Sequence, residues 1–300
     1  MRARWPIWLF LLPGGLLFLV FFVTPTLYGL SLSFTNWNGI SPHYNWIGVS
    51  NYTNMFTNDS VFWEAVQNTF KFVATTVILQ SLFSLIFALL LLRNTRTNVF
   101  FRTLFFFPTI LSTVSVAFIW MFIYDPNIGI LNTALGDVGL TAWQHDWLGN
   151  KVIAIFCLAM VQVWAHTGQL LIIYLAGLQQ IPQEYYEVAK IEGANRWQTF
   201  WRVTWPLLVP VTTMVVAYTT IQSFQAFVLV FALTNGGPGN ATEILGTYIY
   251  HQAFMNNHFG YAAAISVVFM IIIAVLTMGQ FGILRLRIGG SMGNKEVNPT

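Results

Sequence analysis

Two groups of polar side chains lie inside long apolar stretches of this chain, where a polar group is costly unless it faces protein or water. The first group has i, i+4 and i+7 spacing, which puts its members on one face of a helix: Gln162, His166 and Gln169. The second group is Thr219, Gln222, Ser223 and Gln225, and its first three members share roughly one face with Ala226. Amides, imidazole and hydroxyls can both donate and accept hydrogen bonds, which suits a neutral polyhydroxyl ligand.

The same residues have two other interpretations. Uncharged amides and hydroxyls commonly bond between membrane helices, and each such bond contributes about 0.6 to 2 kcal/mol. His166 is also a candidate proton relay, although no carboxylate accompanies it in these stretches. The residues alone leave ligand binding and helix-to-helix bonding as equal alternatives.

The sequence offers no apparatus for covalent chemistry. It contains no G-x-x-x-x-G-K-[ST] loop for ATP phosphates, no HExxH, no GxSxG and no carboxylate pair within the apolar stretches. Its one cysteine, Cys157, excludes a disulfide framework and a cysteine-based metal site. We therefore predict no catalytic residue, no metal site and no cofactor in this chain.

The composition is that of a membrane protein: 56% of the 300 residues are hydrophobic and only 8% are charged. A spanning helix needs about 20 mostly apolar residues. Six windows meet this length: about 7–30, 66–92, 103–124, 151–178, 206–233 and 261–284. The first continues without a small-residue cleavage site, so we interpret it as a retained span. The predicted fold is all-α, a polytopic bundle of six transmembrane helices forming a single transmembrane domain over residues 1–300.

The distribution of basic residues predicts the orientation, because cytoplasmic loops carry an excess of lysine and arginine. With the N-terminus inside, the outer side keeps only Lys71 and Lys151. The inner side collects the others: Arg2, Arg4, Arg93, Arg96, Arg102, Lys190, Arg196, Arg202, Arg285, Arg287 and Lys295. Both termini and the loop at 179–205 are therefore expected in the cytoplasm. Basic residues spread over short loops fit topology better than nucleic-acid binding.

The longest polar interruption in the second half of the chain is the stretch 181–210, IPQEYYEVAKIEGANRWQTFWRVTWPLLVP. Pro182 is suited to begin a helix, because its missing N–H is not needed there. Good helix formers continue from Gln183 to Ile191, and Gly193 is expected to end or bend the helix. Ala189 and Gly193, four apart, leave one helix face nearly bare, which allows another backbone to approach.

This stretch resembles the EAA loop of membrane subunits of binding-protein-dependent ABC importers. The matching residues are Glu187, Ala189, Glu192, Gly193, Ala194, Phe200, Pro206 and Pro210. Val188 and Glu192 depart mildly from the usual alanine and aspartate. The resemblance implies that residues 183–205 dock on an ATP-hydrolysing subunit. It also implies ATPase coupling through Glu187, Ala189, Glu192, Gly193 and Ala194, with ATP and Mg²⁺ bound by two partner ATPase subunits.

Further matches extend the resemblance over nearly the whole chain. They include Gly48, Asn51 and Tyr52, the stretch FRTLFFFPTILSTVSVAFIWMFIYDPNIGILN, and the GGP turn at 236–238. Together they look like the larger-type partner of the two unlike permease subunits in carbohydrate importers of the maltose and glycerol-phosphate kind. That resemblance puts eight residues on the sugar-contacting positions of the maltose-type subunit: Gln162, Ala165, His166, Gln169, Thr219, Gln222, Ser223 and Ala226.

The resemblance further implies a bacterial or archaeal plasma membrane, a second homologous permease subunit, and an external solute-binding protein at outer loops 31–65, 125–150 and 233–260. The cargo would be a sugar or oligosaccharide; a glycerol-phosphate ester is the alternative within the class. An ion-coupled secondary transporter is the alternative from another class. It usually has broken spans and repeats, and the sequence shows no clear pair of broken spans.

Overall fold

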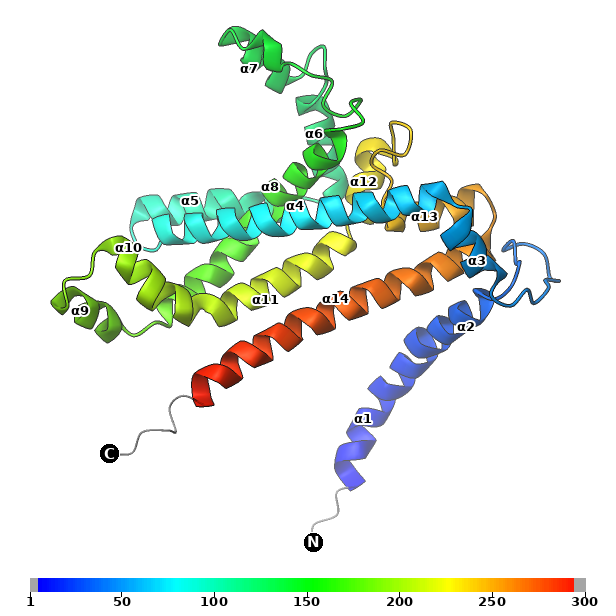
Figure 1. The fold of residues 1–300 in the computed structure, drawn as a ribbon, viewed down its shortest axis with the longest axis horizontal. Helices are drawn as coiled ribbons and strands as arrows, with labels where there is room; N and C mark the ends of the chain where they lie inside the picture. Colours follow the sequence, from blue (N-terminus) through cyan, green and yellow to red (C-terminus); the bar gives the residue numbers. More distant parts are fainter. Residues whose placement is uncertain (1–4, 294–300) are drawn as a thin grey trace. The chain divides into compact units, whose positions relative to one another are not determined.

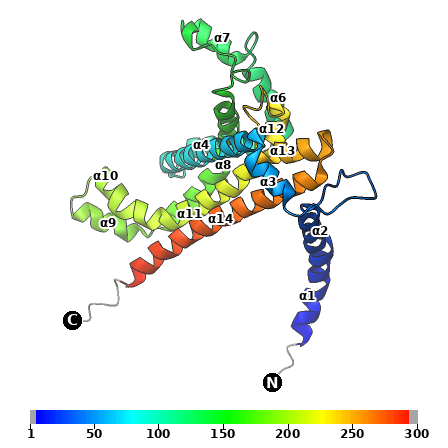
Figure 2. The same cartoon turned by 45° about the vertical axis from the view of Figure 1, so that its right-hand side comes forward.

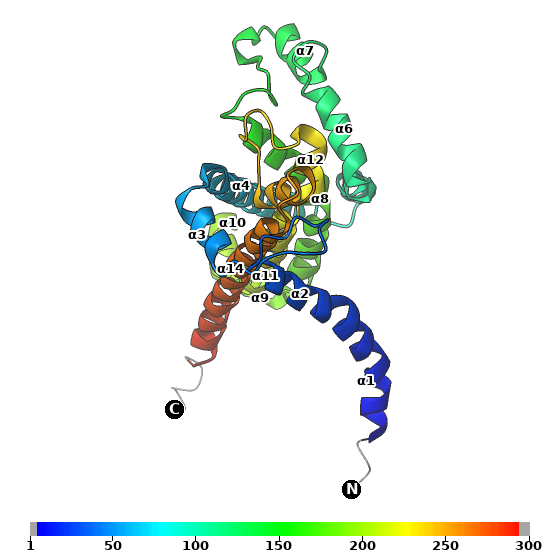
Figure 3. The same cartoon turned by 90° about the vertical axis from the view of Figure 1, so that its right-hand side faces the viewer.

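The computed structural model describes residues 5–293, and contacts within the chain divide it into two compact units. The first unit contains the residues up to Trp63 together with Thr247–Ile272, and the second contains Glu64–Gly246 and the residues from Ile273 onward. Three basic residues used to predict the orientation lie outside the described residues: Arg2, Arg4 and Lys295. Every regular element from residue 5 to 293 is helical, which confirms the predicted all-α class (Figures 1, 2 and 3).

The first unit contains the N-terminal helices and an irregular loop. Its elements are α1 (Trp5–Phe18), the π-helical turn η1 (Leu19–Val23), α2 (Thr24–Leu32), α3 (Ser50–Thr57), the start of α4 (Ser60–Leu90), the end of α13 (Leu245–Tyr250), the π-helical turn η5 (His251–Met255) and the start of α14 (Phe259–Gly293). The Asn51 amide nitrogen donates to the carbonyls of Ser33, at 2.8 Å, and Thr35, at 2.9 Å. This ties α3 to the end of the first span.

The second unit is the helical bundle. Its elements are the rest of α4, α5 (Arg96–Phe106), the 3₁₀ turn η2 (Phe107–Ile110), α6 (Thr113–Ile123), α7 (Ile130–Asp137), the 3₁₀ turn η3 (Thr141–Trp143), α8 (Ala154–Gln179), α9 (Gln183–Ile191), α10 (Arg196–Thr199), the π-helical turn η4 (Phe200–Thr204), α11 (Trp205–Phe224), α12 (Phe227–Thr234), the start of α13 and the rest of α14. Figure 1 shows α8 crossing between α4 and α11.

The core of the second unit is built by α4, α8 and α11. Its buried side chains are Leu85, Ala88, Leu170, Leu171, Tyr174, Leu175, Leu178, Leu208 and Val215. Helix α5 approaches α8 so closely that a Cβ atom added to Gly168 would lie 2.0 Å from the carbonyl oxygen of Phe105. Only glycine leaves room for that contact, which is the small-residue packing expected between membrane helices.

The window 103–124 was predicted as one span, but it does not form one continuous helix. The structure contains two helical segments, Arg96–Ile110 and Thr113–Ile123, which bend by 103° at their junction. Pro108 has no N–H to donate, and Ser112 begins α6 by accepting the Ser115 N–H at 3.2 Å. Including this bent pair as one span, the described residues contain up to six helices that are long and apolar enough to cross a membrane.

The window 206–233 is also interrupted. The helical path begins earlier, at Arg196, and ends at Phe224; a new helix, α12, starts at Phe227. The two short helices that follow the breaks, α6 and α12, pack against each other (Figure 3). The sequence showed no clear pair of broken spans; the structure contains one sharply bent pair, and Arg196–Phe224 is long and apolar enough to count as a span by itself. Length and hydropathy did not reveal the breaks, because both sides of each break are apolar.

Candidate functional site

The predicted polar face of α8 is largely buried within the second unit. Gln162 is 3% exposed and Ala165 is 4% exposed. The Thr109 hydroxyl of η2 donates to the Ala165 carbonyl at 2.9 Å. Ala165 therefore lies beneath the turn that joins α5 to α6, and the bend in the third window is anchored on the face predicted to contact sugar.

His166 and Gln169, one turn further along α8, are half-buried. The Gln169 amide nitrogen donates to the Tyr218 hydroxyl of α11 at 2.9 Å. The His166 Nδ1 atom is buried and has no hydrogen-bond partner among the residues that the structure describes. The α8 face therefore combines one bond between helices with a ring nitrogen whose bonding capacity is unused.

The second predicted group is divided by the break after α11. The Thr219 hydroxyl is fully buried and donates to the Val215 carbonyl of its own helix at 2.8 Å. Within the described part of the chain, the Gln222 Oε1 and Ser223 Oγ atoms are buried without a hydrogen-bond partner. Ala226 lies in the break, with φ −74° and ψ 24°, so the predicted common face is wrong for this residue.

A third polar row, on α4, was missed by the sequence argument. Thr76, Gln80 and Ser84 are spaced by four residues and all are 0% exposed. The Ser84 hydroxyl donates to the Thr167 carbonyl of α8 at 3.0 Å, whereas neither polar atom of the Gln80 side chain has a partner among the described residues. The i, i+4, i+8 spacing was visible in the sequence and predicts this row on one helix face.

The stretch 181–210 folds as two short helices around a left-handed residue. Helix α9 has Glu184 in its first turn and Lys190 in its last, the order that the helix dipole favours. Gly193 follows with φ +76°, and the Ala194 N–H closes the helix end by donating to the Ala189 carbonyl at 2.9 Å. The predicted helix end at Gly193 is confirmed, since a left-handed backbone favours glycine there.

Asn195 starts the next helix with a reciprocal cap. Its side-chain oxygen accepts the Gln198 N–H, and the Gln198 side chain accepts the Asn195 N–H, both at 2.9 Å. The chain then continues through α10 and η4 into α11. This arrangement connects the short helix α9 to a long helix of the bundle by one capped turn (Figure 2).

The two faces of α9 differ. Ala189 is 6% exposed and Tyr186 hydrogen-bonds Thr204 of η4 at 3.3 Å, so this face lies against its own chain. Glu187 and Glu192 are exposed. Three apolar side chains on the other surface were not predicted as contacts, and they are also exposed: Tyr185, Val188 and Ile191. An exposed apolar surface beside acidic groups is typical of a protein contact.

A comparison with known proteins finds a solved structure with the same fold and relatives that are similar in sequence. Over nearly its whole length the chain resembles a solved bacterial ABC transporter involved in the import of the acidic polysaccharide alginate, with a TM-score of 0.81, 23% identity and coverage of 94% of this chain and 95% of that one. At this identity the likeness shows the fold.

Relatives are more similar in sequence. The multiple sugar-binding transport system permease protein MsmF of Streptococcus mutans is 35% identical over 91% of this chain and 93% of its own length. The arabinooligosaccharides transport system permease protein AraP of Bacillus subtilis is 32% identical over 95% of this chain and 88% of its own length. Residues 80–289 match a model of one transport family. The chain is a multi-pass membrane protein that belongs to the family of binding-protein-dependent transport system inner membrane components.

Proposed function

We propose that this chain is a permease subunit of an ATP-driven importer that moves a sugar or oligosaccharide across a bacterial or archaeal plasma membrane. Its family membership makes transport depend on a binding protein. The names of MsmF and AraP, which describe sugar and arabinooligosaccharide transport, support a carbohydrate cargo. A glycerol-phosphate ester is a weaker candidate, because no lysine or arginine belongs to the polar faces of α8 and α11.

The observation that carries the proposal is the shape of the α9 segment. A short charged helix, exposed on one face, is joined through Gly193 and a capped turn to α11. ATPase subunits that grip this face and close on ATP would move α11 with it. The surface that the ATPase grips would be formed or shaped by Glu187, Glu192, Gly193 and Ala194. The cleft of the ATPase would be filled by Tyr185, Val188 and Ile191. Ala189 would act from the inner face, by allowing close packing on η4.

The path for the cargo is proposed along the polar faces of the second unit. His166, Gln222 and Ser223 each have a buried polar atom without a partner in the described chain. A polyhydroxyl cargo could bond to all three once the bundle opens, because imidazole, amide and hydroxyl match sugar hydroxyls. Gln162, Ala165, Gln169, Thr219 and Ala226 complete the proposed lining.

The proposal needs partners beyond the ATPases. None of the side chains in the most apolar window of Phe10–Leu32 is buried within this chain, so this span is available to lipid and to a second permease subunit. With the N-terminus inside, the outer loops 31–65, 125–150 and 233–260 receive the loaded binding protein. ATP and Mg²⁺ belong to the two ATPase subunits, and residues 183–205 of this chain are their docking segment.

Disulfide trapping tests the docking step. In a Cys157→Ala background, Val188→Cys is paired with single cysteines placed along the cleft of the partner ATPase, in the assembled transporter. We expect a crosslink at Val188→Cys whose yield changes when ATP is added. The control is Thr199→Cys on the half-buried side of α10, which should not crosslink. Crosslinking of both positions equally, or of neither, would contradict the proposed docking face.

Transport itself is tested in proteoliposomes that contain the complete transporter and its binding protein. We expect ATP-dependent accumulation of at least one sugar from a panel of maltotriose, arabinotriose, diacetylchitobiose and lactose. Uptake that follows an imposed ion gradient without ATP would instead support the secondary-transporter alternative. Uptake of glycerol 3-phosphate and of no sugar would replace the proposed cargo.

A further inference from the structure

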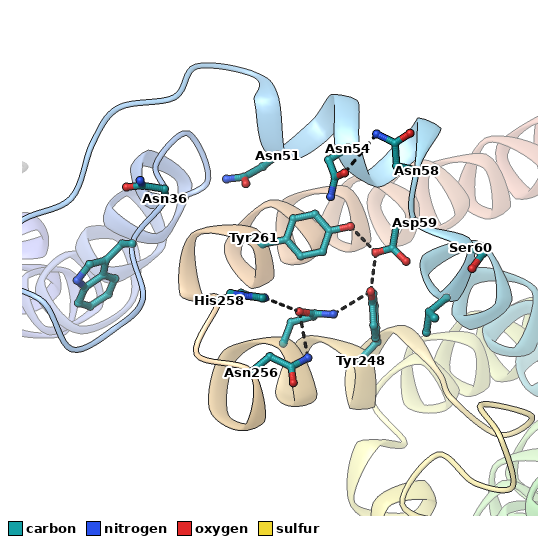
Figure 4. A pocket seen from close by; sticks show the side chains of 13 residues that line it. Asn36, Asn51, Asn54, Asn58, Asp59, Ser60, Tyr248, Asn256, His258 and Tyr261 are labelled. Atoms are coloured by element: carbon teal, nitrogen blue, oxygen red, sulfur yellow. Dashed lines mark hydrogen bonds between the residues drawn. The ribbon is translucent and has the colours of Figure 1, made fainter.

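The first unit contains a polar cavity to which no residue of α8 or α11 contributes. It has a volume of about 600 Å³, and α3, the start of α4, the segment Tyr248–His258 and Tyr261 of α14 surround it (Figure 4). Small-molecule sites commonly have volumes of about 300 to 1,000 Å³. Six of its lining side chains are primary amides: Asn36, Asn51, Asn54, Asn58, Gln252 and Asn256.

Asp59 is the only acidic residue of this lining, and both oxygens of its carboxylate already accept hydrogen bonds. The Tyr248 and Tyr261 hydroxyls both donate to Oδ2, and the Phe62 N–H donates to Oδ1 at 2.9 Å, where Asp59 caps the start of α4 (Figure 4). Three donors on one carboxylate stabilise its charge within the protein. The cavity therefore does not need a cation to balance Asp59.

Hydrogen bonds centred on the Gln252 amide hold the side of the cavity that the segment Tyr248–His258 forms. The Gln252 amide nitrogen donates to the Tyr248 hydroxyl at 2.9 Å. Its oxygen accepts from the Asn256 amide at 3.3 Å and lies 3.2 Å from the His258 Nδ1 atom. Because Tyr248 also reaches Asp59, one continuous set of bonds joins η5 to the α3–α4 junction. A wall held in this way presents its groups in fixed positions, which lowers the ordering cost of binding.

The chemistry of this lining selects a ligand class. No lysine or arginine is among the lining residues, so the cavity offers no ammonium or guanidinium group to pair with a phosphate or carboxylate. Asn54 on α3 and Asn58, which follows the end of α3, are exposed and form between them a single weak contact of 3.4 Å. Their remaining donors and acceptors match hydroxyl groups, which also both donate and accept.

We propose that this cavity is an outer carbohydrate-binding site, where a neutral sugar or oligosaccharide binds through its hydroxyls before it enters the spans. The distribution of basic residues predicts that 31–65 and 233–260 both lie on the outer side, which would give the site access to arriving cargo. This inference rests on the proposed function and adds to it a second, external subsite. A protein contact for the binding protein is the competing use of the cavity.

The test measures sugar binding to the assembled transporter in nanodiscs without its binding protein. The probe is whichever radiolabelled sugar of the panel maltotriose, arabinotriose, diacetylchitobiose and lactose the complete transporter takes up. Asn54→Leu with Asn58→Leu removes two exposed amides from the rim. The matched control, Thr53→Leu with Thr57→Leu, alters two exposed residues of the same helix outside the lining. We expect the dissociation constant to rise about tenfold in the first variant, since two hydrogen bonds are lost, and to stay within twofold in the control.

Asn54→Ala with Asn58→Ala adds no apolar bulk, so it serves as a second variant in case the leucine substitutions disturb folding. It should also raise the dissociation constant of the sugar. Equal binding by wild type and both amide variants, or no binding of the transported sugar by wild type, would overturn the site while leaving the proposed function intact. Loss of stimulation by the binding protein with unchanged sugar binding would assign the cavity to a protein contact and also overturn it. Absence of ATP-driven uptake of every panel sugar would count against the proposed function and the site together.

Discussion

The side-chain amide of Gln169 donates to the hydroxyl of Tyr218 at 2.9 Å, and this bond joins the middle of α8 to α11. The sequence left open whether this face of α8 binds a ligand or bonds to another helix. Gln169 lies on the face expected to contact sugar, and its bond to Tyr218 is a bond between helices. An amide has two donor hydrogens and one acceptor oxygen. Gln169 therefore retains bonding capacity for a ligand while it holds two helices together.

A double-mutant cycle separates the two roles of Gln169. Gln169→Leu and Tyr218→Phe, alone and combined, should give a coupling energy of about 0.6 kcal/mol in unfolding measurements, the average for such membrane bonds. Tyr218→Phe should leave the KM of uptake within twofold, whereas Gln169→Leu should raise it, because only Gln169 is proposed to contact cargo. Equal KM values in both single variants would reduce Gln169 to a packing role.

Gln222 allows a sharper test, because its Oε1 atom is buried without a partner in the described chain. Replacement of an unsatisfied polar group by an apolar one of similar shape is often neutral or stabilising. We expect Gln222→Met to keep or raise the thermal stability of the transporter, and to raise the KM of uptake about three- to tenfold through the lost ligand bond.

Gln225→Met is the matched control, since this glutamine lies three residues away with an exposed side chain. It should change neither quantity. A destabilised Gln222→Met protein with unaltered KM would show that the amide serves the fold, against the proposed lining.

How far the sequence predicts this structure can be judged from particular elements. The helix at 183–191 was predicted with both of its ends, because Pro182 and Gly193 act through local geometry that residue type alone specifies, whereas the Asn195 cap was not predicted. The bend at 111–112 was not, because it depends on Thr109 bonding α8 and on the approach of Phe105 to Gly168. Contacts between segments distant in sequence leave no local pattern.

The candidate site, too, was predicted from the sequence only in part. Spacing predicted one common face on each of two helices; α8 is continuous over its three polar residues, but the break at Gln225 and Ala226 separates Ala226 from the face of α11. The bonds that decide which groups remain free, such as Thr219 to Val215, depend on rotamers that the sequence does not give. The cavity around Asp59 was missed entirely, because its lining comes from segments almost two hundred residues apart.

Gly168→Ala tests the close contact between α5 and α8. The added Cβ atom would lie 2.0 Å from the Phe105 carbonyl oxygen, so the backbones must separate. Overpacking of this kind typically costs about 1 to 3 kcal/mol, and we expect a corresponding loss of stability in thermal unfolding of the purified transporter. Gly29→Ala in α2 is the control, because no atom lies within 4 Å of its added Cβ and helix propensity favours alanine. Equal stability of the two variants would contradict the contact.

The carboxylate of Asp125 predicts a local response to pH in the loop that follows α6. The backbone N–H groups of Asn127 and Ile128 donate to its carboxylate at 2.8 and 3.0 Å, and they lower its pKa below the usual value of a carboxyl group. The stabilisation is therefore present above the ordinary pKa of about 3.9 and is lost as pH falls through the lowered value.

Hydrogen exchange, corrected for intrinsic rates, should show protection of the Asn127 and Ile128 amides at neutral pH that disappears in acid. Asp125→Asn keeps the shape without the charge, so its weaker protection should not vary with pH. Protection that is as pH-dependent in this variant as in wild type would assign the effect to another group.

The last prediction concerns transmission from α9 to α11 through Gly193. Its φ of +76° strains any residue with a Cβ atom by about 1 to 2 kcal/mol, while the surrounding space is open, with no atom within 4 Å of an added Cβ. Gly193→Val should therefore insert and assemble with the ATPase, but shift α9 against α11 and uncouple ATP hydrolysis from uptake. Gly193→Asn is the control of choice, because asparagine tolerates the left-handed conformation and should retain most uptake. Uptake per ATP hydrolysed, measured in proteoliposomes, should fall at least several-fold only in the valine variant; normal coupling there would show that α9 does not need this backbone geometry to transmit motion.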